Sequence, residues 1–402
     1  MAILAVAMLG YVREQWDDDA QFTHRDFHNF YNAGTRIRAG EAVYQHDEIP
    51  FLLTPLAAPA VVVLSYIPER VAFVMAAVVT AALFVLAVIR VARTCGGEVR
   101  PQITACFLAC SMPPFWFALY LGQLSGLYLF LLATSLALLA VPKTEGRTIH
   151  TEAVAGFLVA VLCVKPQLAL VVLLVGVLRR AWAMLASFAV VLLILWGSSI
   201  PFLGVRAILE WREQVTWCTE ALEGADTTWW RQFTLYAFLR SVTSRADMDM
   251  SVARGLYLGI TGPLGIATLL AVRAALAPDE RKLALRAVAI LVLASIALNA
   301  YLFYYDAAFL VVPWMIAFLA YSTYAPVTRA LIVVAAAVSW VLALTTPILE
   351  AGEVPLPGLV ATIWLIIELL DLRYGTRAQL SFRSGAPTRS VPPTQAVERV
   401  SA

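Results

Sequence analysis

Charge is the scarcest property of this sequence. Only 14% of its 402 residues are Asp, Glu, Lys or Arg, whereas soluble domains carry about a quarter. Lysine is rarer still and occurs only as Lys143, Lys165 and Lys282. Hydrophobic residues make up 61% of the chain, a surplus that a soluble fold could not hide from water. The low charge therefore excludes an ordinary soluble domain, and the net charge of +2 gives no indication of nucleic-acid binding.

Cysteine motifs of metal or redox sites are also missing. The five cysteines form no C-x-x-C pattern, and their apolar surroundings favour small buried hydrophobic residues. The segment Met1–Val12 is apolar but has neither a basic start nor a small-residue cleavage site. It is therefore interpreted as a short first membrane helix rather than a signal peptide.

Long apolar runs are abundant, and Val71–Val91 is an example. Runs of about 18 to 25 residues are long enough to cross the ~30 Å of hydrocarbon as a helix. They are continuous and rich in Ala, Leu and Val, whereas the strands of a membrane barrel alternate. The sequence thus predicts an all-α polytopic protein without a soluble domain or internal repeat. The expected spans are residues 1–12, 70–92, 101–120, 123–141, 152–164, 167–178, 183–201, 250–274, 284–300, 306–322, 327–346 and 357–372.

Basic residues supply the orientation, because they gather in cytoplasmic loops. With the N-terminus inside, most arginines and all lysines except Lys165 fall on the cytoplasmic side or in long outside loops, and the short outside turns near residues 122, 303 and 350 hold none. If Phe51–Ile67 were counted as a span, the arginines that follow it would fall on the outside. We therefore interpret that proline-containing segment as re-entrant or interfacial. The layout predicts one transmembrane domain over residues 1–373, two cytoplasmic termini, and a disordered tail over residues 374–402.

The first long outside loop, Arg13–Pro50, is the most informative segment. It holds three of the four histidines, among them His28, and it places Arg25 beside Asp26. The spacing of Phe27, Phe30 and Tyr31 predicts a helix that lies on the membrane, which would hold Asp26 near the lipid boundary. A helix-capping aspartate is the alternative interpretation.

Lys165 interrupts the apolar stretch Ala153–Leu178 together with Pro166 and Gln167. The stretch is too long for one span, so two short helices are expected to meet on the outside. A lysine at membrane depth is costly and by default indicates function. Extension of its ammonium group to the membrane surface is the alternative.

Three more polar clusters fall at outside positions of this layout. Gln123 lies in a glycine-rich turn, and Trp230 and Arg231 end the second long loop. Tyr305 precedes the tenth expected span and Asp306 begins it. Each has a structural alternative, namely a connecting turn, an interfacial aromatic belt and a helix cap. Five clusters on one face nevertheless favour a binding or active site on the outside.

These residues resemble glycosyltransferase family 87. The resemblance rests on Asp26 followed by FYNAG, on RAGEAVY (38–44), and on four later motifs in the same order. Those motifs are GQLSGLYLFLLATSLALL (122–139), KPQLALVVLLVGVLRRAW (165–182), RQFTLYAFLR (231–240) and YLFYYDAAFLVVP (301–313). The family belongs to the GT-C class of polytopic enzymes, which take a sugar from a polyprenyl-phosphate donor, and it is related to the mycobacterial mannosyltransferases that act on phosphatidylinositol mannosides.

The resemblance implies an inverting transfer with Asp26 as general base, mannose as the favoured sugar, and a lipid or glycan acceptor. It further implies the bacterial plasma membrane and an active site on its outer face. Lys165 and Arg231 would face the leaving phosphate, with Arg25 and His28 behind them, and no metal, cofactor, nucleic acid or protein partner is implied. The remaining expected substrate contacts are Tyr31, Gln123, Gln167, Trp230, Tyr305 and Asp306. Where many family members carry Ser-Pro and paired histidines, this chain has Asn299–Asp306, which leaves sugar and acceptor open.

The main competing hypothesis is a secondary transporter or lipid-carrier flippase. It would explain twelve helices and a membrane lysine, but the sequence shows no paired half-repeats with matching broken helices. A membrane scaffold would not require polar clusters on one face. A lipid-linked oligosaccharide ligase of the same class would change the acceptor more than the site. The enzyme hypothesis predicts that Asp26, Lys165 and Arg231 surround one cavity open to lipid.

Overall fold

The computed structural model describes residues 26–44, 52–224, 232–320, 324–345 and 356–384. Regular structure in these ranges is helical, apart from an isolated bridge between Gln232 and Phe303. An all-helical fold is therefore confirmed for the described part of the chain. The first expected span, residues 1–12, lies outside it.

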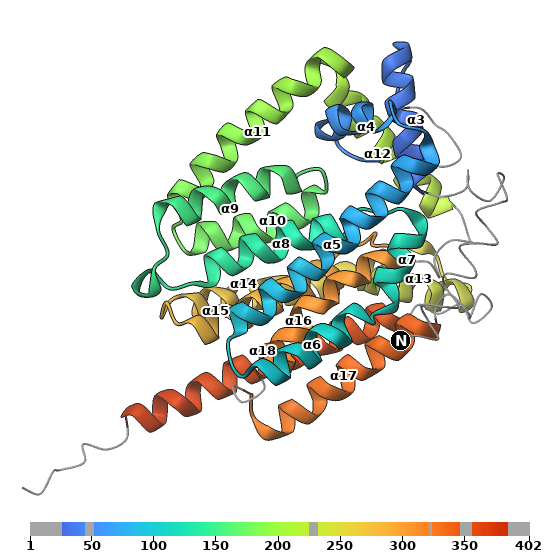
Figure 1. Ribbon diagram of the computed structural model, residues 1–402. Helices are drawn as coiled ribbons and strands as arrows, with labels where there is room; N and C mark the ends of the chain where they lie inside the picture. The colour runs from blue at the N-terminus through green and yellow to red at the C-terminus, as the bar shows by residue number, and fades with distance from the viewer. Residues whose placement is uncertain (1–25, 45–51, 225–231, 321–323, 346–355, 385–402) are drawn as a thin grey trace, which may run out of the picture.

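Figure 1 shows how the described helices are arranged. Their bounds are α3 (Asp26–Ala39), η1 (Pro55–Ala57), α4 (Ala58–Leu64), α5 (Glu69–Cys95), α6 (Val99–Cys110), α7 (Pro113–Leu121), α8 (Ser125–Ala140), η2 (Lys143–Glu145), α9 (Ile149–Leu162), α10 (Pro166–Leu178), α11 (Trp182–Leu203), α12 (Ala207–Gly224), α13 (Leu235–Arg245), α14 (Met250–Leu276), α15 (Arg281–Ala297), η4 (Tyr304–Leu310), α16 (Val311–Leu319), α17 (Pro326–Thr345) and α18 (Leu356–Ser384).

Three helices, α5, α11 and α14, are long and apolar enough to cross a membrane, and the bent pair α6 and α7 would make a fourth. Large apolar side chains cover the outside of α11 and α14, with Leu193 71% exposed and Ile266 62% exposed. Water would not tolerate surfaces of this size, so the protein is embedded in a membrane. Each expected span from 70–92 onward coincides with a helix or helix pair, but several are short, and twelve crossings stay a prediction.

The span expected over residues 101–120 is not one straight helix. It breaks between α6 and α7, whose axes differ by 47°. Pro113 and Pro114 stand at the first two positions of α7, and they cannot donate the backbone hydrogen bonds that would continue α6. The bent pair together still has the length and apolarity of one span, so a crossing over residues 101–120 stays a prediction.

The proline-rich segment after the first loop forms η1 and α4. Together they cover Pro55–Leu64, a length of about 15 Å at 1.5 Å per residue, which is half of a bilayer core. This geometry agrees with a re-entrant or interfacial piece. At the other end of the chain α18 continues to Ser384, and the expected disorder of the tail lies mostly outside the described residues.

The core is formed by α8, α15 and the η4–α16 segment. Leu132, Ile290 and Phe309 are fully buried there, and Trp364 of α18 packs against the same cluster. Small residues permit close helix crossings: a Cβ on Gly126 would lie 2.2 Å from the Thr80 carbonyl oxygen of α5. Such contacts through small residues replace the hydrophobic driving force that helices lack inside lipid.

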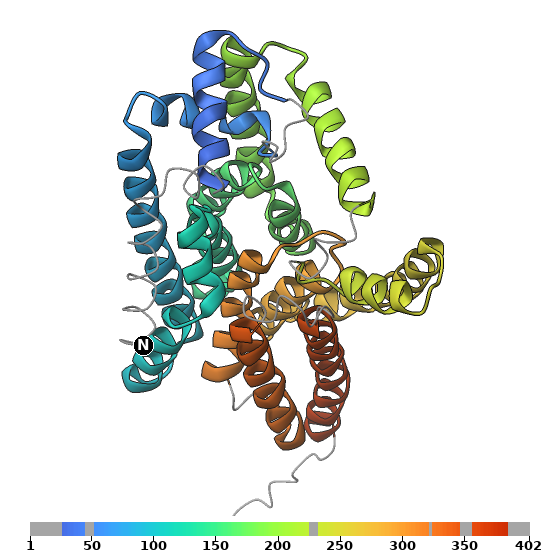
Figure 2. The same cartoon turned by 90° about the vertical axis from the view of Figure 1, so that its right-hand side faces the viewer.

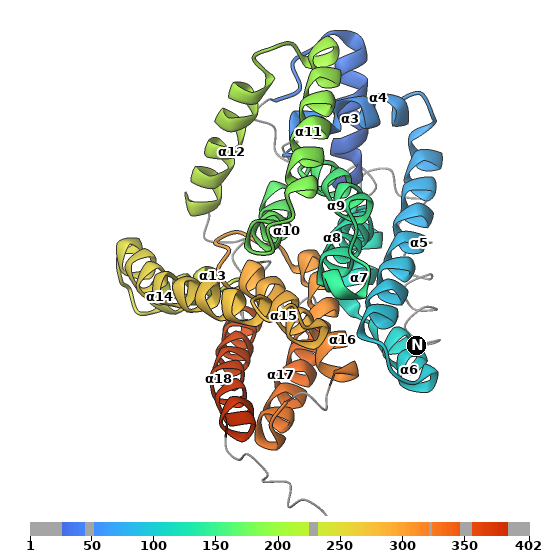
Figure 3. The ribbon, with the colours of Figure 1, turned by 90° about the vertical axis from the view of Figure 1, so that its left-hand side faces the viewer.

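The two ends of the helix bundle differ. The α3 end carries α3, α4 and α12 together with the turns that join α7 to α8, α9 to α10 and α15 to η4, and Figures 2 and 3 show α3, α4 and α12 grouped there. The opposite end carries the loops that join α8 to α9, α10 to α11 and α14 to α15. Successive helices therefore run alternately between the two ends, as the predicted layout requires.

Candidate functional site

Asp26 is the first residue of α3. The amide Nε2 of Gln123, from the turn between α7 and α8, donates a hydrogen bond to Asp26 Oδ2. Next to it Phe27 is 1% exposed and packs edge-on against Phe73 of α5, with ring centroids 5.4 Å apart. Burial of Phe27 thus fixes the start of α3, and Gln123 orients the carboxylate.

Gly122 makes this approach possible. It ends α7 in the left-handed conformation with φ 71°, which glycine adopts without strain. A Cβ at this position would lie 2.4 Å from Cβ of Phe27. No side chain could therefore be accommodated where the α7–α8 turn meets α3.

The outer face of α3 is held by hydrogen bonds to its neighbours. His28 Nδ1 lies 2.7 Å from Glu69 Oε1 of α5, and Asn32 Nδ2 lies 2.8 Å from His28 Nε2. The Tyr31 hydroxyl donates to the Ile67 carbonyl oxygen at 3.0 Å. His28 and Tyr31, both expected to contact substrate, here anchor α3 on α4 and α5.

Lys165 lies at the break between α9 and α10, where Pro166 begins the second helix. Its ammonium group forms an ion pair with the Asp306 carboxylate of η4. The rings of Tyr128, Tyr305 and Phe309 surround the same nitrogen, with centroids 5.6 to 5.7 Å away. Because aromatic faces attract cations, this pocket holds Lys165 at the α3 end of the bundle instead of releasing it to water.

Tyr305 lies near both parts of the site, the Asp26 carboxylate and the Lys165–Asp306 ion pair. Asp26, Asp306 and Tyr128 all lie within electrostatic range of its hydroxyl group, and its ring also contacts Lys165. Residues that are distant in sequence therefore converge on one place. An arrangement with Asp26 and Lys165 on unrelated surfaces would have contradicted the enzyme hypothesis. The structure does not have that arrangement.

Other expected site residues fall elsewhere. Gln167 is exposed on the first turn of α10, and Arg25, Trp230 and Arg231 lie outside the described residues. The segment after Arg231 is placed, because Phe233 N donates to the Leu302 carbonyl oxygen at 2.7 Å. The motifs at residues 231–240 and 301–313 therefore lie side by side next to Tyr305.

A cavity between α5, α8, α15 and α16 is lined by apolar residues such as Leu136 and Val312. It contains neither Asp26 nor Lys165, so the expected cavity open to lipid stays a prediction.

Sequence reasoning missed several residues of this site. Tyr128 and Phe309 lie inside apolar runs, where an aromatic residue gives no signal that it faces a lysine. Glu69 could have been suspected, because it is an acidic residue directly after Pro68 at the edge of a span. Only the packing of α8 and η4 against α10 identifies the two aromatic side chains.

A second polar cluster joins α12, α14 and the turn before η4. Glu223 accepts hydrogen bonds from the Tyr301 hydroxyl at 2.7 Å and from Arg254 at 2.8 Å. Burial tends to raise the pKa of Glu223, but these hydrogen bonds outweigh it and the pKa is lowered overall. The cluster fixes α12 beside the polypeptide that leads into Tyr305.

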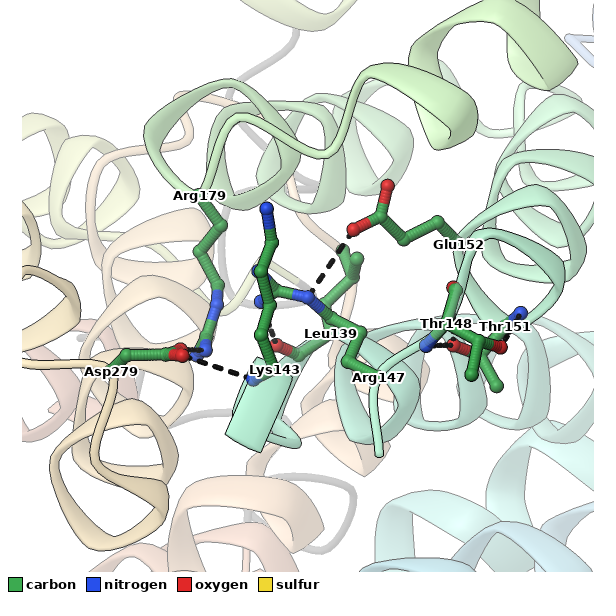
Figure 4. Close-up of polar contacts among 8 residues, drawn as sticks. All are labelled: Leu139, Lys143, Arg147, Thr148, Thr151, Glu152, Arg179 and Asp279. Carbon is green, nitrogen blue, oxygen red and sulfur yellow. Dashed lines mark hydrogen bonds and ion pairs between the residues drawn. The ribbon is translucent and has the colours of Figure 1, made fainter. Parts of the chain in front are cut away.

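At the opposite end the charged residues pair with one another (Figure 4). Arg179 binds Asp279, whose second oxygen accepts from the backbone N–H of Lys143 at 3.0 Å, and Arg147 lies 3.3 Å from Glu152. These contacts join the loops between helices. The carboxylates of Glu152 and Asp279 are thus engaged in holding the fold together.

The comparison with protein families gives one result. The model of glycosyltransferase family 87 matches residues 51–298, which is more than half of the chain and includes Gln123 and Lys165. Asp26 and Asp306 lie outside the matched range, so only the structure connects them with the matched part. No match was found among the curated proteins. The helical membrane fold and the extent of the match together show that the chain belongs to glycosyltransferase family 87.

Proposed function

We propose that this membrane glycosyltransferase transfers a hexose, with mannose as the first choice, from a polyprenyl-phosphate donor to a lipid or glycan acceptor. The reaction takes place at the α3 end, which faces the outside of the bacterial plasma membrane, and both termini are cytoplasmic. The single observation that carries the proposal is the convergence of Asp26 and Lys165 on Tyr305. It brings a potential base and a cation into one site at the membrane boundary.

Asp26 acts as the general base. Its carboxylate removes the proton from an acceptor hydroxyl group while that oxygen attacks the anomeric carbon. The bond between this carbon and the phosphate oxygen breaks, and the configuration inverts because attack and departure occur on opposite faces of the sugar. Gln123 donates to Asp26 Oδ2 and so orients the carboxylate that receives the proton.

Lys165 acts on the leaving group. The polyprenyl phosphate departs with an additional negative charge, and a preorganised cation lowers the energy of the transition state in which that charge develops. The three surrounding rings limit the exposure of the Lys165 side chain to 14%, which strengthens its electrostatic effect. We further propose that three residues outside the described ranges complete the site, namely Arg25, Trp230 and Arg231.

The test is sugar transfer in membranes supplied with radiolabelled polyprenyl-phosphate-mannose, with wild type and Asp26→Asn measured side by side. Label that appears in a new lipid or glycan only with wild type would support the reaction and the base together. Equal transfer by both proteins would exclude Asp26 as the base. Absence of transfer by either, with glucose and galactose donors failing as well, would contradict the donor class and favour a transporter.

A further inference from the structure

The ion pair between Lys165 and Asp306 raises a question about phosphate binding. A cation intended only for a phosphate needs no carboxylate beside it, yet Asp306 is 3% exposed and contacts Lys165 directly. Its backbone N–H donates to the Phe303 carbonyl oxygen at 2.9 Å, which fixes it at the start of η4. Asp306 is thus a built part of the site rather than a flexible surface group.

Lys165 can contact Asp306 and a phosphate at the same time. A lysine ammonium group has three donors, and the ion pair with Asp306 uses one of them. A phosphate oxygen on a second donor would lie about 5 Å from the Asp306 carboxylate, given hydrogen bonds of about 2.8 Å. The phosphate would therefore feel the attraction of Lys165 and the repulsion of Asp306 together.

The aromatic side chain of Tyr128 offers a neutral contact at the same place. Its hydroxyl group is buried and has no hydrogen-bond partner within the described part of the chain, and it lies within electrostatic range of Asp306. A buried hydroxyl group without a partner is unfavourable. A phosphate oxygen beside Lys165 would provide the missing acceptor.

Donor and product differ in charge. The phosphodiester of a polyprenyl-phosphate sugar carries one negative charge, whereas a phosphate monoester carries about 1.5 to 2 at neutral pH. A site that contains Lys165 alone would bind the product more tightly than the donor, and it would be inhibited by the product. A site that contains the Lys165–Asp306 pair opposes that preference.

We propose that Asp306 sets the charge preference of the phosphate site, because it weakens the binding of the more highly charged polyprenyl phosphate left after transfer more than the binding of the singly charged phosphodiester donor. This inference rests on the proposed function, and it adds to it a residue that determines specificity and promotes product release. At an effective dielectric constant of about 20, the extra product charge about 5 Å from Asp306 corresponds to an effect on the order of ten- to a hundredfold in affinity.

The experiment measures binding of two lipids to the purified full-length protein in nanodiscs. The probes are a short-chain polyprenyl phosphate and its methyl phosphodiester, which differ in charge and by one methyl group. Wild type should bind the monoester no more than about tenfold more tightly than the phosphodiester. Asp306→Asn, which removes the charge and keeps the shape, should tighten the binding of both lipids and raise the ratio of monoester to phosphodiester affinity about ten- to a hundredfold.

Two further variants make the comparison specific. Lys165→Met should weaken the binding of both lipids. Asp279→Asn neutralises a carboxylate that pairs with a buried arginine at the opposite end (Figure 4), so it is a matched control for the loss of an ion pair. It should leave the ratio of the two affinities unchanged.

Several outcomes would overturn the inference. Wild type that binds the monoester more than tenfold tighter than the phosphodiester would contradict it without any variant, so the test does not depend on the folding of Asp306→Asn. A folded Asp306→Asn with the wild-type ratio would contradict only the charge preference, provided that Lys165→Met weakens both lipids. Absence of binding of either lipid by wild type would overturn the proposed donor class and this inference with it.

Discussion

The two ends of the helix bundle use charged residues in opposite ways. At the opposite end each described buried cation lies against carboxylates: Arg179 with Asp279, Arg147 with Glu152, and Arg286 at 2.8 Å from Asp371. At the α3 end Asp26 contacts a neutral amide, and Lys165 is surrounded by rings as well as by Asp306. The pairs at the opposite end hold loops and helices together, whereas the Lys165–Asp306 pair at the α3 end lies among aromatic rings next to Tyr305, which is also near Asp26. The comparison therefore separates residues of the fold from residues of the site.

The largest effect is expected from removing the charge of one carboxylate at each end. Asp26→Asn should lower sugar transfer by about 10²- to 10⁴-fold because the general base is lost, with no change in thermal stability. Asp279→Asn should leave transfer per folded molecule within about twofold, because its partner Arg179 lies at the other end of the helices. Transfer rates and melting temperatures of both purified variants check this. A large loss of transfer in Asp279→Asn would remove the distinction between the two ends.

The next effect concerns stability at the opposite end. Arg286→Met leaves Glu368 and Asp371, both buried in α18, without their cation, and it should destabilise the protein by about 3–5 kcal/mol. The matched change Arg254→Met removes an arginine whose side chain is 57% exposed, and it should lower stability far less, because water screens exposed ion pairs. Thermal unfolding in detergent distinguishes the two. Similar melting temperatures for both variants would show that burial does not decide the role of these arginines.

An intermediate effect is expected where the fold supports the site. Gly122→Ala introduces a Cβ that would lie 2.4 Å from Phe27, so it should displace the start of α3, lower stability by about 1–3 kcal/mol, and reduce transfer as well. Gly146→Ala has the same type of left-handed backbone, with φ 107°, but an open surrounding. It should show only the conformational cost of about 1 kcal/mol and normal transfer. Equal transfer by the two variants would argue against the contact between Gly122 and Phe27 as the support of Asp26.

The smallest effect is pH-dependent. The pKa of Glu223 is lowered in the folded protein, so its stabilisation is fully present above its unfolded pKa and is lost as the pH falls through its folded pKa. Because the cluster is partly exposed, Glu223→Gln should lower stability by about 1 kcal/mol or less at pH 7. The difference from wild type should shrink below about pH 4. Melting curves at both pH values measure it, and an equal or larger difference at low pH would exclude the assigned ion pair.

Much of the helical layout was predictable. Apolar run length and the position of Lys165-Pro166 predicted helices from α5 to α11 and from α14 to α18 and the break between α9 and α10, because each depends on local composition. Helices α12 and α13 were not predicted, since they lie in the second long loop. The bend between α6 and α7 was missed, although Pro113 and Pro114 stand in the sequence. A proline pair within an apolar run is compatible with one kinked span or with two helices, and only packing against the neighbouring helices selects between them.

The candidate site was predictable in its members more than in its contacts. Asp26, Gln123, Lys165, Tyr305 and Asp306 stood out as polar residues in an apolar chain. The contacts between them were not predictable. Lys165 was expected to face a phosphate, and its ion pair with Asp306 was not foreseen. His28 and Tyr31 likewise stood out as possible ligands but hold α3 in place. A residue type shows that a group is polar, and its partner depends on chain segments that are distant in sequence.

The sequence by itself determined that this chain is a helical membrane protein, because about 20 apolar residues in a row can satisfy their backbone groups in lipid only as a helix. It also determined which polar residues stand at helix ends, since they interrupt those runs. The tertiary structure alone decided which of them meet. Burial of Phe27 beneath Gly122 brings Asp26 to Gln123, and the packing of η4 on α8 and α10 encloses Lys165. Such contacts arise from the shapes of surfaces far apart along the chain, and no local pattern encodes them.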